Sequence, residues 1–316
     1  MFVQIILLIV GFIVLIKGAD IFVDGSSSIA GNFKVSKMLI GLTIVAFGTS
    51  APELAVSIKS LLSNSGDIVL GNVIGSNILN IFLILGVSSL FHSLNVKNNT
   101  VKKELPITIL ITTLFVSLLS DNLINHTPNN FTRGDGITLL LFFLIFIYYL
   151  ISMARKKIDT EEKEEYMSLP KSFLFTIVGL IAIVLGSNLV VDSASALAKL
   201  LGISEKMIAL TIIALGTSLP ELVTSVTATR KGEYDIAIGN VVGSNIFNLG
   251  IVIGIPVALL GGISKVSFNA IDLIVMLLSV ILLFIFSYND RKITQKEGII
   301  FLILFILYYS YVIYMG

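Results

Sequence analysis

The chain has 316 residues, of which 55% are hydrophobic and 13% are charged, and its mean hydropathy is +0.99. Soluble domains carry about 25% charged residues, and here the charges lie in short stretches between long apolar runs. This pattern excludes a soluble enzyme and a disordered protein, and the net charge of +1 gives no reason to expect a nucleic-acid partner. The absence of cysteine excludes disulfides and thiolate metal sites. The composition predicts an all-α polytopic membrane protein.

Ten apolar segments are long enough to cross a bilayer as helices, which takes about 20 residues each. In chain order they cover residues 2–24, 37–62, 67–91, 105–121, 135–154, 172–192, 206–229, 235–260, 269–288 and 297–315. The lipid bilayer is therefore the expected environment, and the cell membrane is the expected location.

Lysine and arginine are distributed unequally over the connections between these segments. When the connections are sorted into two alternating sides, one side holds 15 of the 21 Lys and Arg residues and the other holds six. The side richer in these residues faces the cytoplasm in most membrane proteins, so both termini are predicted to be external and the linker 154–171 to be cytoplasmic. The acidic cluster of this linker lacks EF-hand spacing, and we interpret it as a solvated charged run.

An internal repeat is the most informative feature. Residues 41–86 align without a gap with residues 209–254, and 22 of the 46 positions are identical. The repeat predicts two five-helix copies, 1–153 and 172–316, on either side of the linker. Because five is an odd number, the second copy would enter the membrane from the opposite side. Inverted repeats are typical of transporters, in which the substrate site lies near the midplane where the copies meet.

Each copy places a glutamate inside an apolar segment, Glu53 at the end of GTSAPE and Glu221 at the end of GTSLPE. An ionised carboxylate at such a depth costs at least about 2.5–3.5 kcal/mol, so a cation or a proton is expected to compensate it. The proline before each glutamate frees a backbone carbonyl four residues back, at Gly48 and Gly216. Carboxylate, hydroxyl and carbonyl oxygens suit Ca²⁺ or Na⁺ better than a soft metal.

Polar side chains extend this pattern along one face of two helices in each copy. At helical spacing the sequence has Thr49, Glu53 and Ser57, then Asn72, Ser76 and Asn80, and in the second copy Thr217, Glu221 and Ser225, then Asn240, Ser244 and Asn248. For G-x-x-x-G faces such as Gly71 to Gly75 and Gly239 to Gly243, simple helix packing is the preferred interpretation. A lone Asn or Ser in a span is also more often an interhelical hydrogen bond than a ligand. The matched glutamates beside broken backbone favour an ion site.

The paired motifs GTSAPE and GTSLPE, with GNVIGSN and GNVVGSN, resemble the two α-repeats of the sodium/calcium exchanger branch of the cation/calcium exchanger superfamily. The likeness covers essentially the whole chain and is closest to the prokaryotic type without a regulatory domain. It implies that Glu53 and Glu221 are central carboxylates shared by Ca²⁺ and Na⁺. It further implies oxygen ligands from Thr49, Thr217, Ala46 and Ala214, flanking Na⁺ sites at Ser50, Ser218, Ser76 and Ser244, and central amides at Asn80 and Asn248. Ca²⁺ and Na⁺ would be transported substrates, with no cofactor, no enzymatic activity and no obligate protein partner.

One position narrows the expectation within the superfamily. Many relatives have Asp where this chain has Asn248, and potassium-dependent exchangers in particular look acidic there, whereas both copies here carry Asn. Proton/calcium exchangers resemble G-N-x-x-E, whereas here Ile74 and Val242 lead into G-S-N. The sequence thus predicts a K⁺-independent, electrogenic Na⁺/Ca²⁺ antiporter that works by alternating access. An H⁺/Ca²⁺ exchanger and a K⁺-dependent Na⁺/Ca²⁺ exchanger are the alternatives.

Two further classes use the same residues differently. A cation channel could employ the oxygens as a filter, and an intramembrane enzyme could employ the two glutamates as acid and base. The duplication around one carboxylate pair favours a carrier over a channel. No nucleophile or histidine accompanies the glutamates, which disfavours an enzyme.

Overall fold

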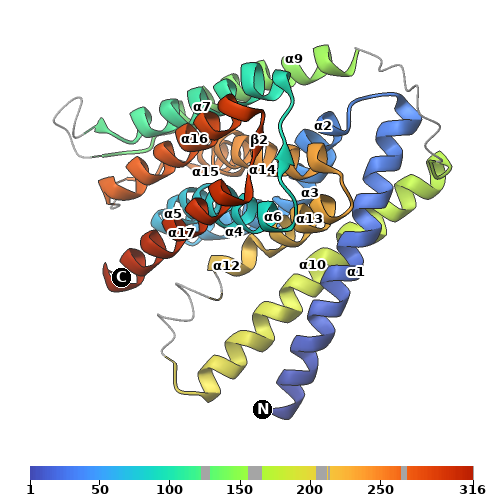
Figure 1. The fold of residues 1–316 in the computed structure, drawn as a ribbon. Coiled ribbons are helices and arrows are strands. Elements are labelled where there is room, and N and C mark those ends of the chain that lie inside the picture. The colour runs from blue at the N-terminus through green and yellow to red at the C-terminus, as the bar shows by residue number, and fades with distance from the viewer. Residues whose placement is uncertain (122–128, 156–165, 204–211, 213, 265–268, 316) are drawn as a thin grey trace.

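The computed structural model describes residues 1–121, 129–155, 166–203, 212, 214–264 and 269–315 (Figure 1). Up to residue 155 the elements are α1 (Phe2–Phe33), α2 (Lys37–Ile40), the π-helical turn η1 (Gly41–Val45), α3 (Ala46–Thr49), α4 (Ala51–Leu62), α5 (Gly66–Leu79), η2 (Asn80–Leu85), α6 (Gly86–Phe91), β1 (Leu94–Asn95), η3 (Thr100–Glu104), α7 (Leu105–Leu118) and α9 (Arg133–Ala154). After it they are α10 (Leu169–Leu200), α12 (Ala214–Thr217), α13 (Leu219–Arg230), α14 (Tyr234–Phe247), η5 (Asn248–Val252), α15 (Gly254–Leu260), α16 (Ala270–Asp290), β2 (Lys292–Ile293) and α17 (Gln295–Met315). The short strands β1 and β2 pair antiparallel.

Seven helical stretches of the described residues are long and apolar enough to cross a membrane, and the number rises to eight if one bent helix pair is counted as a span. The prediction of an all-α polytopic membrane fold is therefore confirmed. The predicted span 105–121 corresponds to α7, which continues η3 without a break, and this helical stretch is not among the seven. The predicted span 206–229 begins in residues outside the described part of the chain. The number ten remains a prediction.

Helices α1 and α10 pack side by side and run antiparallel, and the N-terminal end of α1 reaches away from the other helices (Figure 1). Small residues allow this close approach. A Cβ atom at Gly18 would lie 2.8 Å from the Cβ of Ala182, and one at Gly179 would lie 2.5 Å from the backbone nitrogen of Phe22. Any larger side chain at these glycines would force the two backbones apart.

Both copies contain a helix that breaks immediately before its glutamate. In the first copy, the helical stretches Lys37–Thr49 and Ala51–Leu62 meet at an angle of 44°. The break falls at Ser50 (φ −85°, ψ 5°), and the second copy has nearly the same backbone at Ser218 (φ −90°, ψ 4°). A proline then lies in the first turn of α4 and of α13, where its missing N–H leaves no hydrogen bond unmade. The new helix therefore starts with the glutamate in its first turn.

Elements after the break also correspond between the copies. Helices α4 and α13 each have 12 residues, and α5 and α14 each have 14. Both α5 and α14 pass into a π-helical turn, which begins at Asn80 in one copy and at Asn248 in the other. Such turns are rare in helices and are frequent at functional sites.

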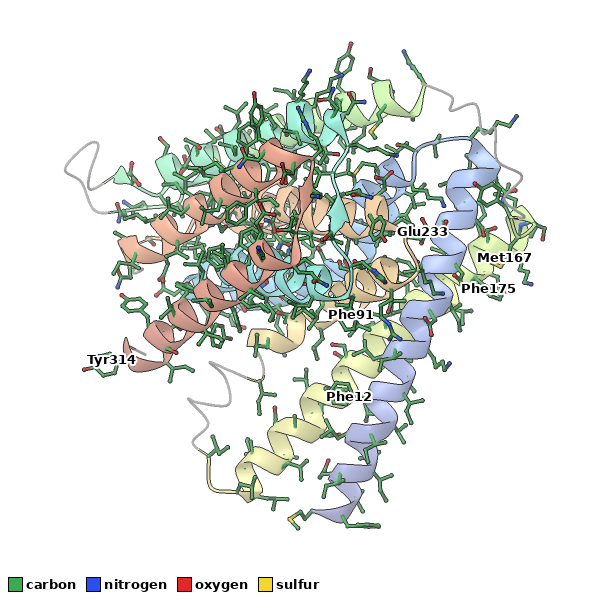
Figure 2. The ribbon with its side chains drawn as sticks, in the orientation of Figure 1. Phe12, Phe91, Met167, Phe175, Glu233 and Tyr314 are labelled. Carbon is green, nitrogen blue, oxygen red and sulfur yellow. The ribbon has the colours of Figure 1, made fainter. Side chains whose placement is uncertain are left out.

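Polar contacts tie the end of α1 to the turn between α13 and α14, and Figure 2 shows Glu233 of this turn beside α1. Ser27 donates a hydrogen bond to Glu233 at 2.8 Å, and Lys37 forms an ion pair with the same carboxylate at 2.9 Å. Lys231 pairs with Asp24 at 2.7 Å. These contacts explain why α1 continues to Phe33, although its apolar run predicted an end near residue 24: the polar turns of the helix have partners on another element.

Candidate functional site

Glu53 and Glu221 are enclosed by the protein, and each is only 1% exposed. Ser50 donates a hydrogen bond to Oε1 of Glu221 at 3.0 Å, but Oε2 of both glutamates has no hydrogen-bond partner. The two carboxylates are close enough to repel each other electrostatically. Each lies in the first turn of its helix, where the partial positive charge of the N-terminus favours an anion. The arrangement leaves two buried, partly unsatisfied carboxylates close together.

Hydrogen bonds across the site connect the first copy to the second. They run from Ser50 to Glu221 at 3.0 Å, from Thr49 to Oδ1 of Asn240 at 3.0 Å, from Ser218 to the hydroxyl of Ser76 at 3.4 Å, and from Asn80 to Asn245 at 2.9 Å. Every one of these bonds joins residues from opposite sides of the 154–171 linker. The structure thus brings predicted site residues of both copies into one cluster.

Further buried oxygens without a hydrogen-bond partner lie on the helices that carry the carboxylates, on α5 and α14, and in the π-helical turns that follow α5 and α14. They include Oγ of Ser57, Oδ1 of Asn77, Oδ1 of Asn80, Oγ1 of Thr224, Oγ of Ser244 and Oδ1 of Asn248. A buried oxygen without a partner costs about 1–3 kcal/mol, and native structures contain few of them. Oxygens of carboxylate, amide and hydroxyl groups are the donor set that Na⁺ and Ca²⁺ prefer. The cluster fits a cation that would satisfy these oxygens.

The remaining predicted ligands lie at the breaks. Ala46 is fully buried in α3, and its carbonyl accepts a hydrogen bond from the backbone N–H of Ser50 at 3.0 Å. Ala214 and Thr217 are the first and last residues of α12, and the side chain of Ala214 lies outside the described part. The proline at position 220 predicts a freed carbonyl at Gly216. In the structure Ser187 of α10 donates to it at 3.0 Å, because this helix packs against the break.

The side chain of Asn240 forms three hydrogen bonds, one of which is the bond from Thr49. It is fully buried, and its amide nitrogen donates to Ser225 at 2.9 Å and to the backbone carbonyl of Glu221 at 3.3 Å. In the first copy, Asn72 donates to the backbone carbonyl of Glu53 at 3.4 Å. Both copies thus use this asparagine to hold the start of the helix that bears the glutamate.

Two asparagines, Asn77 and Asn245, were not among the predicted ligands. Both are 1% exposed, and the side chain of Asn245 lies between Asn80 and the backbone of Asn77. The signal that could have identified them is the G-S-N motif itself, in which the asparagine recurs in both copies. Their spacing places them off the polar stripe of Asn72, Ser76 and Asn80, so helical periodicity alone does not select them.

The glycines of the two G-x-x-x-G motifs differ in how closely other residues pack against them. A Cβ at Gly239 would lie 2.9 Å from the Cα of Gly41, and one at Gly243 would lie 2.7 Å from the Cβ of Ala46. The packing interpretation is therefore confirmed for the second copy. A Cβ at Gly71 or Gly75 would meet no atom of the described residues within 4 Å.

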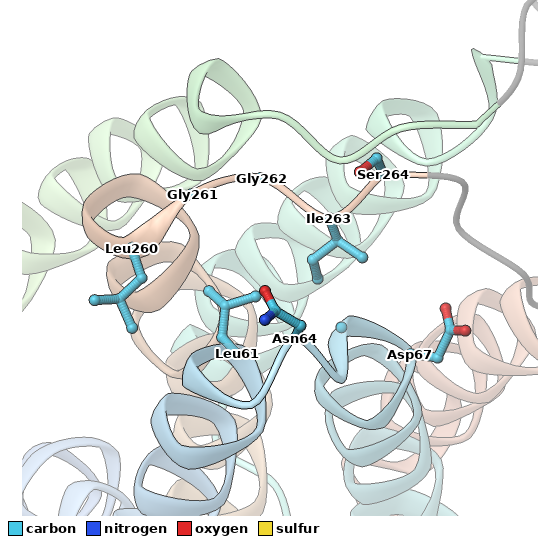
Figure 3. A pocket seen from close by; sticks show the side chains of 9 residues that line it. Leu61, Asn64, Asp67, Leu260, Gly261, Gly262, Ile263 and Ser264 are labelled. Carbon is cyan, nitrogen blue, oxygen red and sulfur yellow. The ribbon is translucent and has the colours of Figure 1, made fainter.

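A surface pocket of about 250 Å³ lies apart from the carboxylates, between the turn after α4 and the segment after α15 (Figure 3). Asn64 and Asp67 line one side of it and Leu260 to Ser264 line the other. Neither Glu53 nor Glu221 contributes to this pocket. The candidate cation site is thus an enclosed cluster of oxygens and is distinct from this surface hollow.

Comparisons with known proteins agree with this geometry. The profile of the family described as sodium/calcium exchanger protein matches residues 3–152 and 171–314. The inner membrane protein YrbG of Escherichia coli is 36% identical over 87% of this chain and 86% of its own length. The sodium/calcium exchanger MaX1 of Methanosarcina acetivorans is 32% identical over 96% of this chain and 97% of its own length.

Among solved structures, the sodium-calcium exchanger NCX_Mj superposes with a TM-score of 0.84 at 33% sequence identity, covering 97% of each chain. The likeness inferred from the two motif pairs is confirmed over nearly the whole sequence. MaX1 and NCX_Mj are named as exchangers and not as enzymes. The chain belongs to the sodium/calcium exchanger family of membrane proteins.

Proposed function

We propose that this protein is an antiporter that exchanges Na⁺ for Ca²⁺ across the cell membrane, at a central site built from Glu53 and Glu221. The observation that supports it most strongly is the pair of enclosed carboxylates with unpartnered oxygens. A buried carboxylate pair without compensation is costly, and a bound cation removes that cost. Membership of the exchanger family supports the same conclusion.

The surrounding oxygens divide into two groups in this proposal. Backbone and side-chain oxygens of Thr49, Thr217, Ala46 and Ala214, with the amides of Asn80 and Asn248, complete the coordination around the glutamates. Hydroxyls of Ser50, Ser218, Ser76 and Ser244 line flanking Na⁺ sites. The hydrogen bonds from Ser50 to Glu221 and from Ser218 to Ser76 support this grouping, because they place the serines beside the central cluster.

Charge balance determines which ions can replace each other at such a site and whether a transport cycle moves net charge. One Ca²⁺ or two Na⁺ neutralise two ionised glutamates, so the two kinds of ion compete for the same charges. A further Na⁺ held by neutral hydroxyl and amide oxygens makes each cycle move net charge, and exchange is then electrogenic. Asn80 and Asn248 add no further negative charge, which supports independence from K⁺.

The architecture we propose has ten spans in two inverted five-helix repeats, 1–153 and 172–316. Both termini are external, and the linker 154–171 is cytoplasmic. The antiparallel packing of α1 against α10 and the matched lengths of the later helices support the inversion. Alternating access then exposes one central site to each side in turn.

The direct test is uptake of radiolabelled Ca²⁺ into proteoliposomes loaded with Na⁺. We expect uptake that requires internal Na⁺, proceeds without K⁺ and responds to an imposed membrane potential. A K⁺ requirement would favour the K⁺-dependent alternative, and uptake driven by a pH gradient without Na⁺ would favour an H⁺/Ca²⁺ exchanger. Flux without any requirement for Na⁺ on the opposite side would indicate a channel.

The Asn248→Asp variant tests the interpretation of K⁺ independence in the same assay. It raises the formal charge of the ionised site from −2 to −3, so one more positive charge is needed for balance. We expect Ca²⁺ uptake by this variant to depend on added K⁺ or on pH where the parent protein does not. An unchanged cation dependence would contradict the role given to Asn248.

A further inference from the structure

A chain of amide contacts links the two G-S-N motifs at the centre of the molecule. Asn80 donates from Nδ2 to Oδ1 of Asn245 at 2.9 Å, and Asn245 donates from its own Nδ2 to the backbone carbonyl of Asn77 at 3.4 Å. All three residues are 1% exposed. Water therefore hardly reaches these groups and does not readily replace either hydrogen bond.

The direction of this chain is fixed by its last member. A backbone carbonyl can only accept a hydrogen bond, so the nitrogen of the Asn245 amide must face Asn77. The oxygen of the same amide must then face Asn80, and Asn80 must present its nitrogen in return. Consequently Oδ1 of Asn80 points away from Asn245 and is buried without a partner.

The end of the Asn80 amide that remains free decides what this residue can bind. An amide oxygen attracts a cation, whereas the N–H groups at the opposite end repel it. The two ends have nearly the same shape, so packing alone selects poorly between them. A hydrogen bond to the nitrogen end selects the orientation that a cation site requires.

We propose that Asn245 is a positioning residue for ion binding, which orients the Asn80 amide so that its oxygen faces the cation. This inference rests on the proposed function. In this proposal Asn245 acts through Asn80: its oxygen accepts a hydrogen bond from Asn80, and its nitrogen donates one to the backbone carbonyl of Asn77.

The equivalent side chain of the first copy does not play this part in the described conformation. Asn77 donates from Nδ2 to the Val73 carbonyl of its own helix at 2.9 Å, and its Oδ1 has no partner. Oδ1 of Asn248, the counterpart of Asn80, has no partner either. Asn77 thus contributes its backbone to the chain of contacts, whereas Asn245 contributes its side chain. The control is Thr108→Val on α7, because the buried Thr108 hydroxyl donates to a backbone carbonyl of its own helix at 2.8 Å and is not part of the proposed site.

The test measures the KM for Ca²⁺ and the maximal rate of Na⁺-driven uptake in proteoliposomes. We expect Asn245→Leu to raise the KM by about tenfold, as loss of one oriented hydrogen bond near a charged ligand predicts. The maximal rate should stay within about threefold of the parent, because ligand binding and not helix movement is altered. Thr108→Val should leave the KM within about threefold. If Asn245→Leu is not recovered as a monodisperse protein, Asn245→Ala is measured instead, and the same increase in KM is expected.

A double-mutant cycle separates positioning from a merely structural role. Calcium binding to the detergent-solubilised protein is measured by calorimetry for Asn80→Ala, Asn245→Leu and the double variant. If Asn245 acts through Asn80, the double variant binds Ca²⁺ as weakly as Asn80→Ala and no more weakly. Additive losses, or an unchanged KM in Asn245→Leu, would overturn the proposal. Absence of Na⁺-driven Ca²⁺ uptake by the parent protein would instead overturn the proposed function.

Discussion

The segments GNVIGSN (71–77) and GNVVGSN (239–245) differ at one residue, yet they lie in different surroundings. Gly71 is exposed and Asn72 is partly buried, whereas their counterparts Gly239 and Asn240 are fully enclosed. The glycines of the second segment pack against η1 and α3 of the first copy. A Cβ atom at Gly71 or Gly75 of the first segment would have no described atom within 4 Å. Identical residues thus supply the same oxygens in both copies, but their surroundings among the described residues differ.

This difference has a direct meaning under the proposed mechanism. Among the described residues, the second segment is closed in by packing and hydrogen bonds, and Gly71 and Gly75 of the first segment have open space beside them. In an inverted-repeat transporter, access to the opposite side requires the two halves to exchange these conditions. Under this mechanism the described conformation is one of two, and the closed packing of the second segment belongs to it.

Alanine substitutions at the first glycine of each segment, Gly71 and Gly239, should change stability in opposite directions, which gives the largest difference between the two copies. A Cβ at Gly239 would lie 2.9 Å from backbone of η1, so we expect Gly239→Ala to destabilise by about 1–3 kcal/mol. Gly71→Ala meets no described atom and should stabilise α5 by about 0.5–1 kcal/mol, because alanine favours helix. Thermal unfolding in detergent measures both, and equal shifts would contradict the packing difference.

Alanine substitution at the first asparagine of each segment should likewise destabilise the protein more in the second copy than in the first. Asn240→Ala removes the acceptor of Thr49 and the donor to Ser225 within a buried cluster, which should cost about 1–3 kcal/mol. Asn72→Ala removes one long hydrogen bond of a partly buried residue and should cost less than about 1 kcal/mol. Chemical unfolding of the two purified variants tests this order. A larger loss in Asn72→Ala would mean that the first half is the closed one.

The smallest effect is expected at the turns that precede the two segments. Glu233 pairs with Lys37 and bonds Ser27 across to α1, whereas the repeat-equivalent residue of the first copy is Ser65. The Lys37 and Glu233 side chains are partly exposed, so Glu233→Gln should cost about 0.2–1 kcal/mol. Choline chloride at high concentration should reduce this difference by screening. A difference in unfolding temperature that is insensitive to salt would contradict an ion-pair origin.

Sequence reasoning predicted those features that depend on a single helix. The apolar runs predicted the membrane-spanning character, and a proline before each glutamate predicted a break whose position the structure places at Ser50 and Ser218. Features that depend on which helices meet were not accessible. The Gly216 carbonyl is bonded by Ser187, and the side chain of Asn245 reaches the other copy.

Helix ends illustrate the same limit. The apolar run of α1 stops near residue 24, but the helix continues because Asp24 and Ser27 find Lys231 and Glu233 on the turn after α13. Periodicity within one segment does not contain this information. A contact between residues more than 200 positions apart follows only from the packing of the whole bundle.

Glutamine substitution at the central carboxylates tests the account most directly. Glu53→Gln and Glu221→Gln keep side-chain size but remove the negative charge that balances the cations, so each should abolish Na⁺-driven Ca²⁺ uptake in proteoliposomes. Glu104→Gln is the matched control, because Glu104 is fully buried but bonds Tyr149 away from the site, and it should retain uptake. We predict that Glu53→Gln and Glu221→Gln lose uptake and that Glu104→Gln keeps it. Full uptake by either one would contradict a site built from both carboxylates.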